Sequence, residues 1–142
     1  MTENEFRFKY CELMQYYQLI EFHLRGICAG LLADEDSNWF DRLRDYETDS
    51  LGLLVNKIQA IQEQGQLRLF SQEDFNALQE LRKKRNYWTH QCFIGGSPVV
   101  FPHGKVKRSE HAEKVVRDLE DAMEWEEKIT KIGNSDGLRY VW

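Results

Sequence analysis

Apolar positions near the start of the chain follow the repeat of an amphipathic helix. From Phe6 to Leu31 they recur at alternating spacings of three and four residues, which places one stripe along a helix of about seven or eight turns. Thr2 followed by Glu5 is the pattern of a capping box at the start of that helix. Polar residues 34–38 end the repeat. The stripe consists of Phe6, Tyr10, Leu13, Tyr17, Ile20, Leu24, Ile27 and Leu31.

A second helix is predicted from about residue 51 to residue 64. Ser50 can cap its start, and Gly65 can end it. The preceding stretch, residues 39–49, mixes aromatic and charged side chains without a clear period, so its conformation stays ambiguous. The buried face of this helix is formed by Leu51, Leu54, Val55, Ile58 and Ile61.

A third helix is predicted to start at Ser71, where Asp74 completes a second capping-box pattern. Its apolar side begins with Phe75, Leu78 and Leu81 and runs to about Phe93. Gly95, Gly96 and Pro98 then break the helix. Residues 94–108 are expected to form a loop with a short hairpin that pairs residues 99–101 with residues 105–107.

The last predicted helix runs from about Ser109 to Ile132 and is ended by Gly133 and Asn134. We therefore expect an all-α fold, a four-helix up-and-down bundle with a short hairpin or loop between the third and fourth helices. Residues 1–142 are enough for one domain. The buried positions expected on the last helix are Ala112, Val115, Val116, Leu119, Met123 and Ile129.

Composition narrows the classes of function. The net charge of −5 argues against a protein that holds duplex DNA by bulk positive charge, but it leaves room for a local basic site. The three cysteines (Cys11, Cys28 and Cys92) have no metal-ligand spacing, so buried, reduced thiols are expected and no metal or cofactor. No apolar run is long enough to span a membrane, and the acidic N-terminus lacks the order of a signal peptide. A soluble, cytoplasmic protein is expected.

Candidate chemistry lies in the second half of the third helix. Arg85 occupies a position on the stripe of Leu81 and Trp88 that the pattern would give to an apolar residue. A guanidinium on such a face needs an anionic partner, either a carboxylate or a phosphate. Asn86 and His90 are four residues apart and share one helix face, whereas Arg85 lies about 140° round from His90 and can reach over with its long side chain.

The pattern of Arg85 and His90 can also arise by chance or for purely structural reasons. An Arg-x4-His match arises by chance in roughly a quarter of sequences of this composition. A single arginine on a buried stripe is often an internal salt bridge, here with an acid of the last helix. The candidate acids are Glu113, Asp118 and Asp121.

The pattern Arg85-Asn86-x3-His90, near the end of the third helix of a four-helix chain, resembles the ribonuclease-type motif of the HEPN superfamily. The segment Leu-Gly-x-Leu-Val-x-x-Ile over residues 51–58 also resembles one that many prokaryotic HEPN proteins have in their second helix. The resemblance implies cleavage of RNA without a metal ion, by a homodimer whose two motifs face each other across the subunit interface.

The chemistry of such a reaction is consistent with these residue types. Attack of a ribose 2'-hydroxyl on the adjacent phosphate needs a base on one side and an acid on the other, which His90 and its symmetry mate could supply. Arg85 would stabilise the charge that accumulates on phosphorus, and Asn86 would orient a phosphate oxygen or His90. The products would be a 2',3'-cyclic phosphate and a 5'-hydroxyl.

Basic residues flank the motif and could bind RNA, with aromatic side chains such as Trp88 available for stacking. The alternative is that the lysines form a solvated face and that the aromatic residues belong to the core. The basic candidates are Arg82, Lys83, Lys84, Lys105, Lys107 and Arg108.

Three hypotheses follow from the sequence. The first is an endoribonuclease, a toxin or defence effector controlled by an antitoxin protein, with RNA rather than DNA as its partner. The second is a non-catalytic HEPN dimer that binds nucleic acid, a nucleotide or a protein. The third is a plain helical interaction module, which predicts an internal carboxylate beside Arg85 and a buried His90. The first two hypotheses predict both side chains at the mouth of a dimer cleft.

Overall fold

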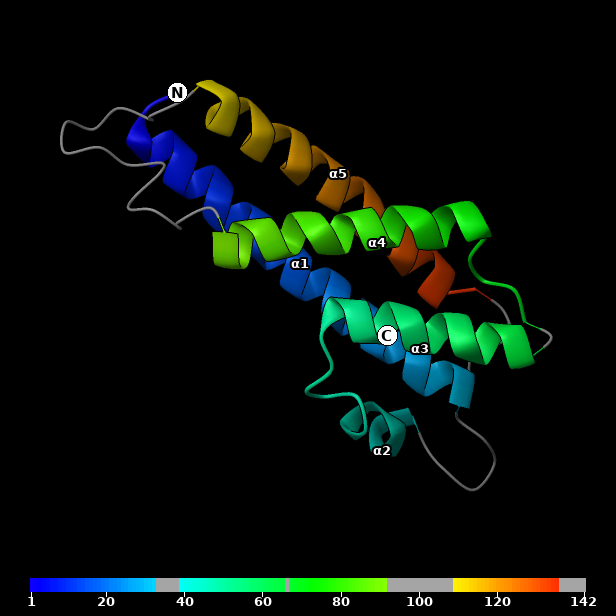
Figure 1. Ribbon diagram of the computed structural model, residues 1–142. Coiled ribbons are helices and arrows are strands. Elements are labelled where there is room, and N and C mark those ends of the chain that lie inside the picture. Colours follow the sequence, from blue (N-terminus) through cyan, green and yellow to red (C-terminus); the bar gives the residue numbers. More distant parts are fainter. Residues whose placement is uncertain (33–38, 66, 92–108, 136–142) are drawn as a thin grey trace.

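The computed structural model describes residues 1–32, 39–65, 67–91 and 109–135, which form five α-helices and one π-helical turn without a β-strand (Figure 1). The all-α class is therefore confirmed, whereas the predicted hairpin lies outside the described residues. The helices are α1 (Glu3–Leu32), α2 (Trp39–Arg44), α3 (Leu51–Gln64), α4 (Gln72–Asn86) and α5 (Ser109–Gly133), and the π-turn (Tyr87–Gln91) continues α4.

The four long helices occur where the sequence predicts them, but their order in space differs from the prediction. Figure 1 shows α1, α3 and α5 running in the same general direction and α4 running in the opposite one. An up-and-down bundle would reverse direction at every connection, so this part of the prediction is wrong. The reason is the segment around α2, which returns the chain along α1 before α3 begins. Trp39 of α2 anchors it by donating its indole N–H to the carbonyl oxygen of Gly26 at 3.0 Å.

The stripe of α1 lies at the centre of the core, as predicted. Six of its eight residues are buried, and Tyr10 and Leu31 at its edges are partly buried. On α5 the apolar pattern overestimates burial, because Met123 is 42% exposed. The expectation of buried thiols is confirmed for Cys28 and wrong for Cys11, which is exposed on the outer side of α1.

Two of the three predicted N-cap residues make the expected side-chain hydrogen bonds. Thr2 and Glu5 exchange hydrogen bonds of 2.6 and 3.2 Å, and Ser71 and Asp74 do the same at 3.0 and 3.1 Å. Ser50 is the N-cap residue of α3, but its side chain makes no capping hydrogen bond. The first-turn N–H groups of α3 therefore lack the side-chain acceptor that a capping serine usually provides. Among the described helices, none is long and apolar enough to cross a membrane.

Candidate functional site

The end of α4 is held in place by Trp88, which is completely buried in the π-turn. Its indole N–H donates to Asp118 of α5 at 2.8 Å, and its carbonyl oxygen accepts from the hydroxyl of Tyr10 at 3.1 Å. Trp88 therefore links α4 to both α1 and α5. This confirms that Trp88 belongs to the core, so it is not available for stacking on a base.

Arg85 lies one turn before Trp88 and pairs with a carboxylate inside the fold. Its Nε is 3.3 Å from Oε1 of Glu21 on α1, and the Glu21 side chain is only 10% exposed. The partner is thus an acid of the first helix, so the expected pairing with Glu113, Asp118 or Asp121 is wrong. Asp118 and Asp121 instead bind Lys84, at 3.7 and 2.9 Å.

Glu21 also connects Arg85 to the start of α3. Its second oxygen is 3.7 Å from the guanidinium of Arg25. Arg25 in turn donates to the carbonyl oxygens of Tyr46 and Asp49 at 3.1 and 3.0 Å. Asp49 directly precedes Ser50, the N-cap residue of α3. This network fixes the first turn of α3 relative to the arginine of the motif.

A small polar pocket of about 210 Å³ lies where the first turn of α3 meets α4. Arg82, Arg85 and Asn86 contribute from α4, and the Arg85 guanidinium is 3.5 Å from the side-chain oxygen of Asn86. Gly52 is needed at this contact because a Cβ there would overlap the side chain of Arg82. The α3 side of the pocket consists of Ser50, Leu51, Gly52, Leu53 and Asn56.

His90 is exposed and lies in the π-turn beyond this pocket, whose lining does not include it among the described residues. The structure thus brings Arg85 and Asn86 together and leaves His90 one turn away. Residues five apart come closer to alignment in a π-turn than in an α-helix, because the hydrogen bonds join residues i and i+5.

The third hypothesis from the sequence, a plain helical interaction module, made two predictions about these residues, and the structure agrees with one of them. The internal carboxylate beside Arg85 is present, as a plain interaction module requires. The exposure of His90 contradicts the same hypothesis, which requires a buried imidazole. Arg85 itself keeps 24% of its side chain exposed, so a ligand can still reach it.

The predicted basic residues differ in their surroundings. Lys83 forms an exposed pair with Glu80 at 2.7 Å, which is the solvated alternative. Lys84 is held by the acids of α5, and of the described candidates Arg82 alone lines the pocket. Lys105, Lys107 and Arg108 lie outside the described residues.

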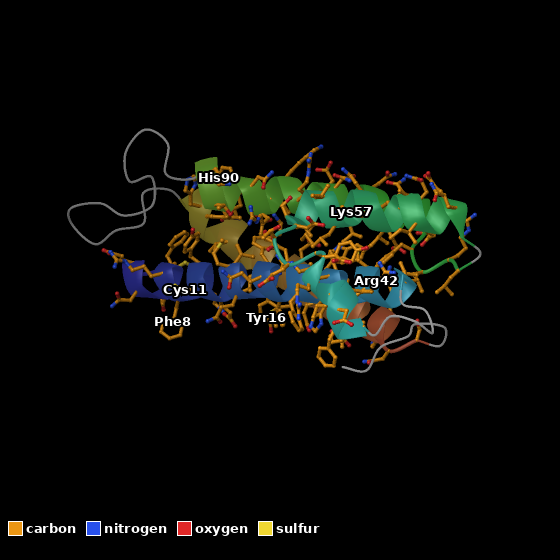
Figure 2. All side chains as sticks on the ribbon, turned by 90° about the horizontal axis from the view of Figure 1, so that it is seen from below. Phe8, Cys11, Tyr16, Arg42, Lys57 and His90 are labelled. Carbon is orange, nitrogen blue, oxygen red and sulfur yellow. The ribbon has the colours of Figure 1, made fainter. Side chains whose placement is uncertain are left out.

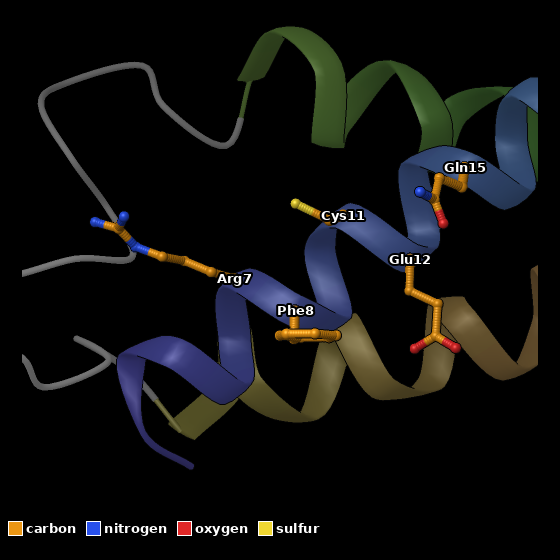
Figure 3. A pocket seen from close by; sticks show the side chains of 5 residues that line it. All are labelled: Arg7, Phe8, Cys11, Glu12 and Gln15. Atoms are coloured by element: carbon orange, nitrogen blue, oxygen red, sulfur yellow. The ribbon is translucent and has the colours of Figure 1, made fainter.

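A larger hollow of about 550 Å³ lies along the outer side of α1 (Figure 3). Phe8, which is 81% exposed, lines it together with Cys11 and Glu12. None of the predicted site residues lines this hollow within the described part of the chain. The described residues also contain no cluster of three or more histidine, cysteine, aspartate or glutamate side chains suited to a metal ion.

Two features of the site were missed from the sequence. Glu21 lies four residues after Tyr17 on the apolar side of α1, so an acid on that stripe was the available signal. The role of Gly52 could not be predicted from the sequence, since it depends on the approach of Arg82 from another helix.

Neither a scan against models of known protein families nor searches of curated proteins and of solved structures found a match to this chain.

Proposed function

We propose that this protein is a metal-independent endoribonuclease of the HEPN type that acts as a homodimer. The observation on which the proposal rests is the placement of Arg85 and Asn86 in one small polar pocket, with the exposed His90 on the next turn of the same helix. A π-turn at this point supports the proposal, because such turns occur frequently at functional sites.

Arg85 is oriented to bind a phosphate while it keeps its internal partner. A guanidinium has five N–H donors in a fixed plane. The Nε of Arg85 faces Glu21, and one terminal nitrogen faces Asn86, so the remaining donors are available for phosphate oxygens. Because Glu21 and Asn86 already orient the guanidinium, Arg85 loses less conformational freedom when it binds the transition state.

Proton transfer is assigned to His90. One imidazole takes the proton from the ribose 2'-hydroxyl, and a second, from the other copy of the chain, protonates the leaving 5'-oxygen. The bond from the 2'-oxygen to phosphorus forms as the bond to the 5'-oxygen breaks, which yields a 2',3'-cyclic phosphate and a 5'-hydroxyl. An imidazole suits both roles since it titrates near neutral pH.

The surface that would bring two copies together follows from where His90 lies. Figure 2 shows His90 on the side of the molecule opposite Phe8 and Tyr16. A two-fold axis that brings two His90 side chains together therefore passes near the end of α4. The outer side of α1 with its exposed Phe8 would lie away from that axis.

The test is incubation of the purified protein with mixed cellular RNA in excess EDTA. We expect the parent to cut RNA and leave 2',3'-cyclic phosphate ends, and His90→Ala and Arg85→Ala to lose at least about a hundredfold in rate. Lys83→Ala is the matched control, because it removes a neighbouring charge that is exposed and outside the pocket. Intact RNA with the folded parent, or equal cleavage by His90→Ala, contradicts the proposal.

The ion pair between Arg85 and Glu21 favours a second candidate function, a non-catalytic HEPN dimer that binds nucleic acid or a nucleotide. In that case the parent binds RNA without cutting it, and Arg85→Ala weakens binding while His90→Ala does not.

The proposed role as a toxin or defence effector is tested separately, by expressing the protein in a host. Expression of the parent would arrest host growth, expression of His90→Ala would not, and a co-expressed antitoxin would restore growth.

A further inference from the structure

Arg82 has no function in the proposed cleavage, yet it lines the polar pocket beside Arg85 and Asn86. Its Nε atom is buried and has no hydrogen-bond partner among the described residues. Its side chain crosses Gly52, where no Cβ stands in the way. A buried guanidinium N–H that lacks a partner costs free energy unless a ligand supplies the acceptor.

The walls of the pocket are suited to an anion. Two arginines line it, and its described lining contains no carboxylate, although the chain as a whole has a net charge of −5. The first turn of α3 forms the opposite wall, and the Ser50 side chain leaves its N–H groups uncapped. Uncapped amides and the positive end of the helix dipole favour a bound phosphate.

The size of the pocket argues against a whole nucleotide bound inside it. Pockets that enclose whole small-molecule ligands usually measure about 300–1,000 Å³, and this one measures about 210 Å³. A tetrahedral anion fits these dimensions better than a nucleoside does. The absence of an aromatic side chain from the described lining agrees, since bases are usually held by stacking.

We infer that Arg82 and the first turn of α3 form a phosphate subsite that holds an RNA phosphate next to the one that is cut. The inference rests on the proposed function and adds a division of labour to it. Arg85 and His90 act at the scissile phosphate, whereas Arg82 with the amides of Gly52 and Leu53 binds its neighbour and sets the position of the strand.

The first experiment uses inorganic phosphate as the probe, titrated at constant ionic strength with chloride as the balancing anion. Two-dimensional ¹H–¹⁵N NMR of the full chain follows the amides of Gly52 and Leu53. We expect saturable shifts at both amides in the parent, in His90→Ala and in Lys83→Gln, and binding at least about tenfold weaker in Arg82→Gln. Unmoved amides in the parent, or equal shifts in Arg82→Gln, overturn the inference.

Gly52→Ala provides a second variant in case Arg82→Gln does not fold. Its methyl group displaces the Arg82 side chain but keeps the charge of the protein, so phosphate binding should again weaken.

An RNA cleavage assay distinguishes the phosphate subsite from the ribonuclease proposal. In this assay Arg82→Gln should raise KM about tenfold with kcat within about twofold. If the parent binds phosphate but leaves RNA intact, the ribonuclease proposal fails and the subsite stands. If RNA is cut and Arg82→Gln alters neither KM nor phosphate binding, the subsite fails and the ribonuclease proposal stands.

Discussion

Glu21→Gln tests whether the buried acid of α1 organises the site. The change keeps the size of the side chain and removes the charge that faces Arg85 at 3.3 Å and Arg25 at 3.7 Å. Removing one partner of a fully buried ion pair costs about 3–5 kcal/mol, whereas an exposed pair contributes about 0–1 kcal/mol. Glu21 is 10% exposed, but its partners are 24% and 21% exposed and can recruit water. We therefore expect a loss of about 2 kcal/mol in the free energy of unfolding.

The assay is urea unfolding at pH 7 of the parent, Glu21→Gln, Arg85→Met and the double variant. For a chain of this size, the expected loss corresponds to a fall in Tm of about 5–10 °C. The double-mutant cycle should give a coupling energy of about 1–2 kcal/mol between the two side chains. Glu12→Gln is the matched control, because this acid lies on the outer side of the same helix beside Lys9, and it should change stability by less than about 0.5 kcal/mol.

Two results would refute this reasoning. If Glu21→Gln unfolds at the same urea concentration as the parent, the ion pair contributes nothing to the fold. A coupling energy near zero between Glu21 and Arg85 would show that any loss comes from elsewhere, for example from Arg25. In either case Glu21 would no longer explain the orientation of Arg85.

Three further predictions concern the helices that build the site. Trp88→Phe removes the donor to the buried Asp118 and should lower the free energy of unfolding by about 2–3 kcal/mol, measured by urea unfolding. Ser71→Ala should cost about 1 kcal/mol since it removes a capping hydrogen bond, whereas Ser50→Ala should cost only a few tenths; equal losses would contradict the assigned caps. Burial lowers the pKa of His23 in the folded protein below the ordinary value of 6.5. The unfolded chain therefore binds a proton first, so stability should fall as the pH drops through about 6.5, and His23→Gln should reduce that fall in a series of melting curves.

Much of the helical layout could be predicted because its signals are local. The bounds of α3 match the predicted range of residues 51–64, and the capping box at Ser71 lies where the sequence places it. Both depend on neighbours within one turn of the chain. Ser50 shows the limit of such reasoning, because a capping residue at the right position still leaves its side chain unbonded.

The sequence also identified Arg85 as an unusual charge on a buried stripe and predicted that it needs an anionic partner. It could not identify that partner, since the choice between Glu21 and the acids of α5 depends on which helices pack together. The same holds for the π-turn, which contains His90 and has no simple signal in the residue pattern.

By itself, then, the sequence determined the four long helices, most of their buried faces and the candidate site residues, because periodicity and capping act over a few residues. Only the tertiary structure decided the direction of α3 relative to α1, the pairing of Arg85 with Glu21 and the meeting of Arg82 with Gly52. Each of these depends on contacts between segments far apart in the chain. Such contacts are set by how whole helix surfaces fit against one another, which no short stretch of sequence encodes.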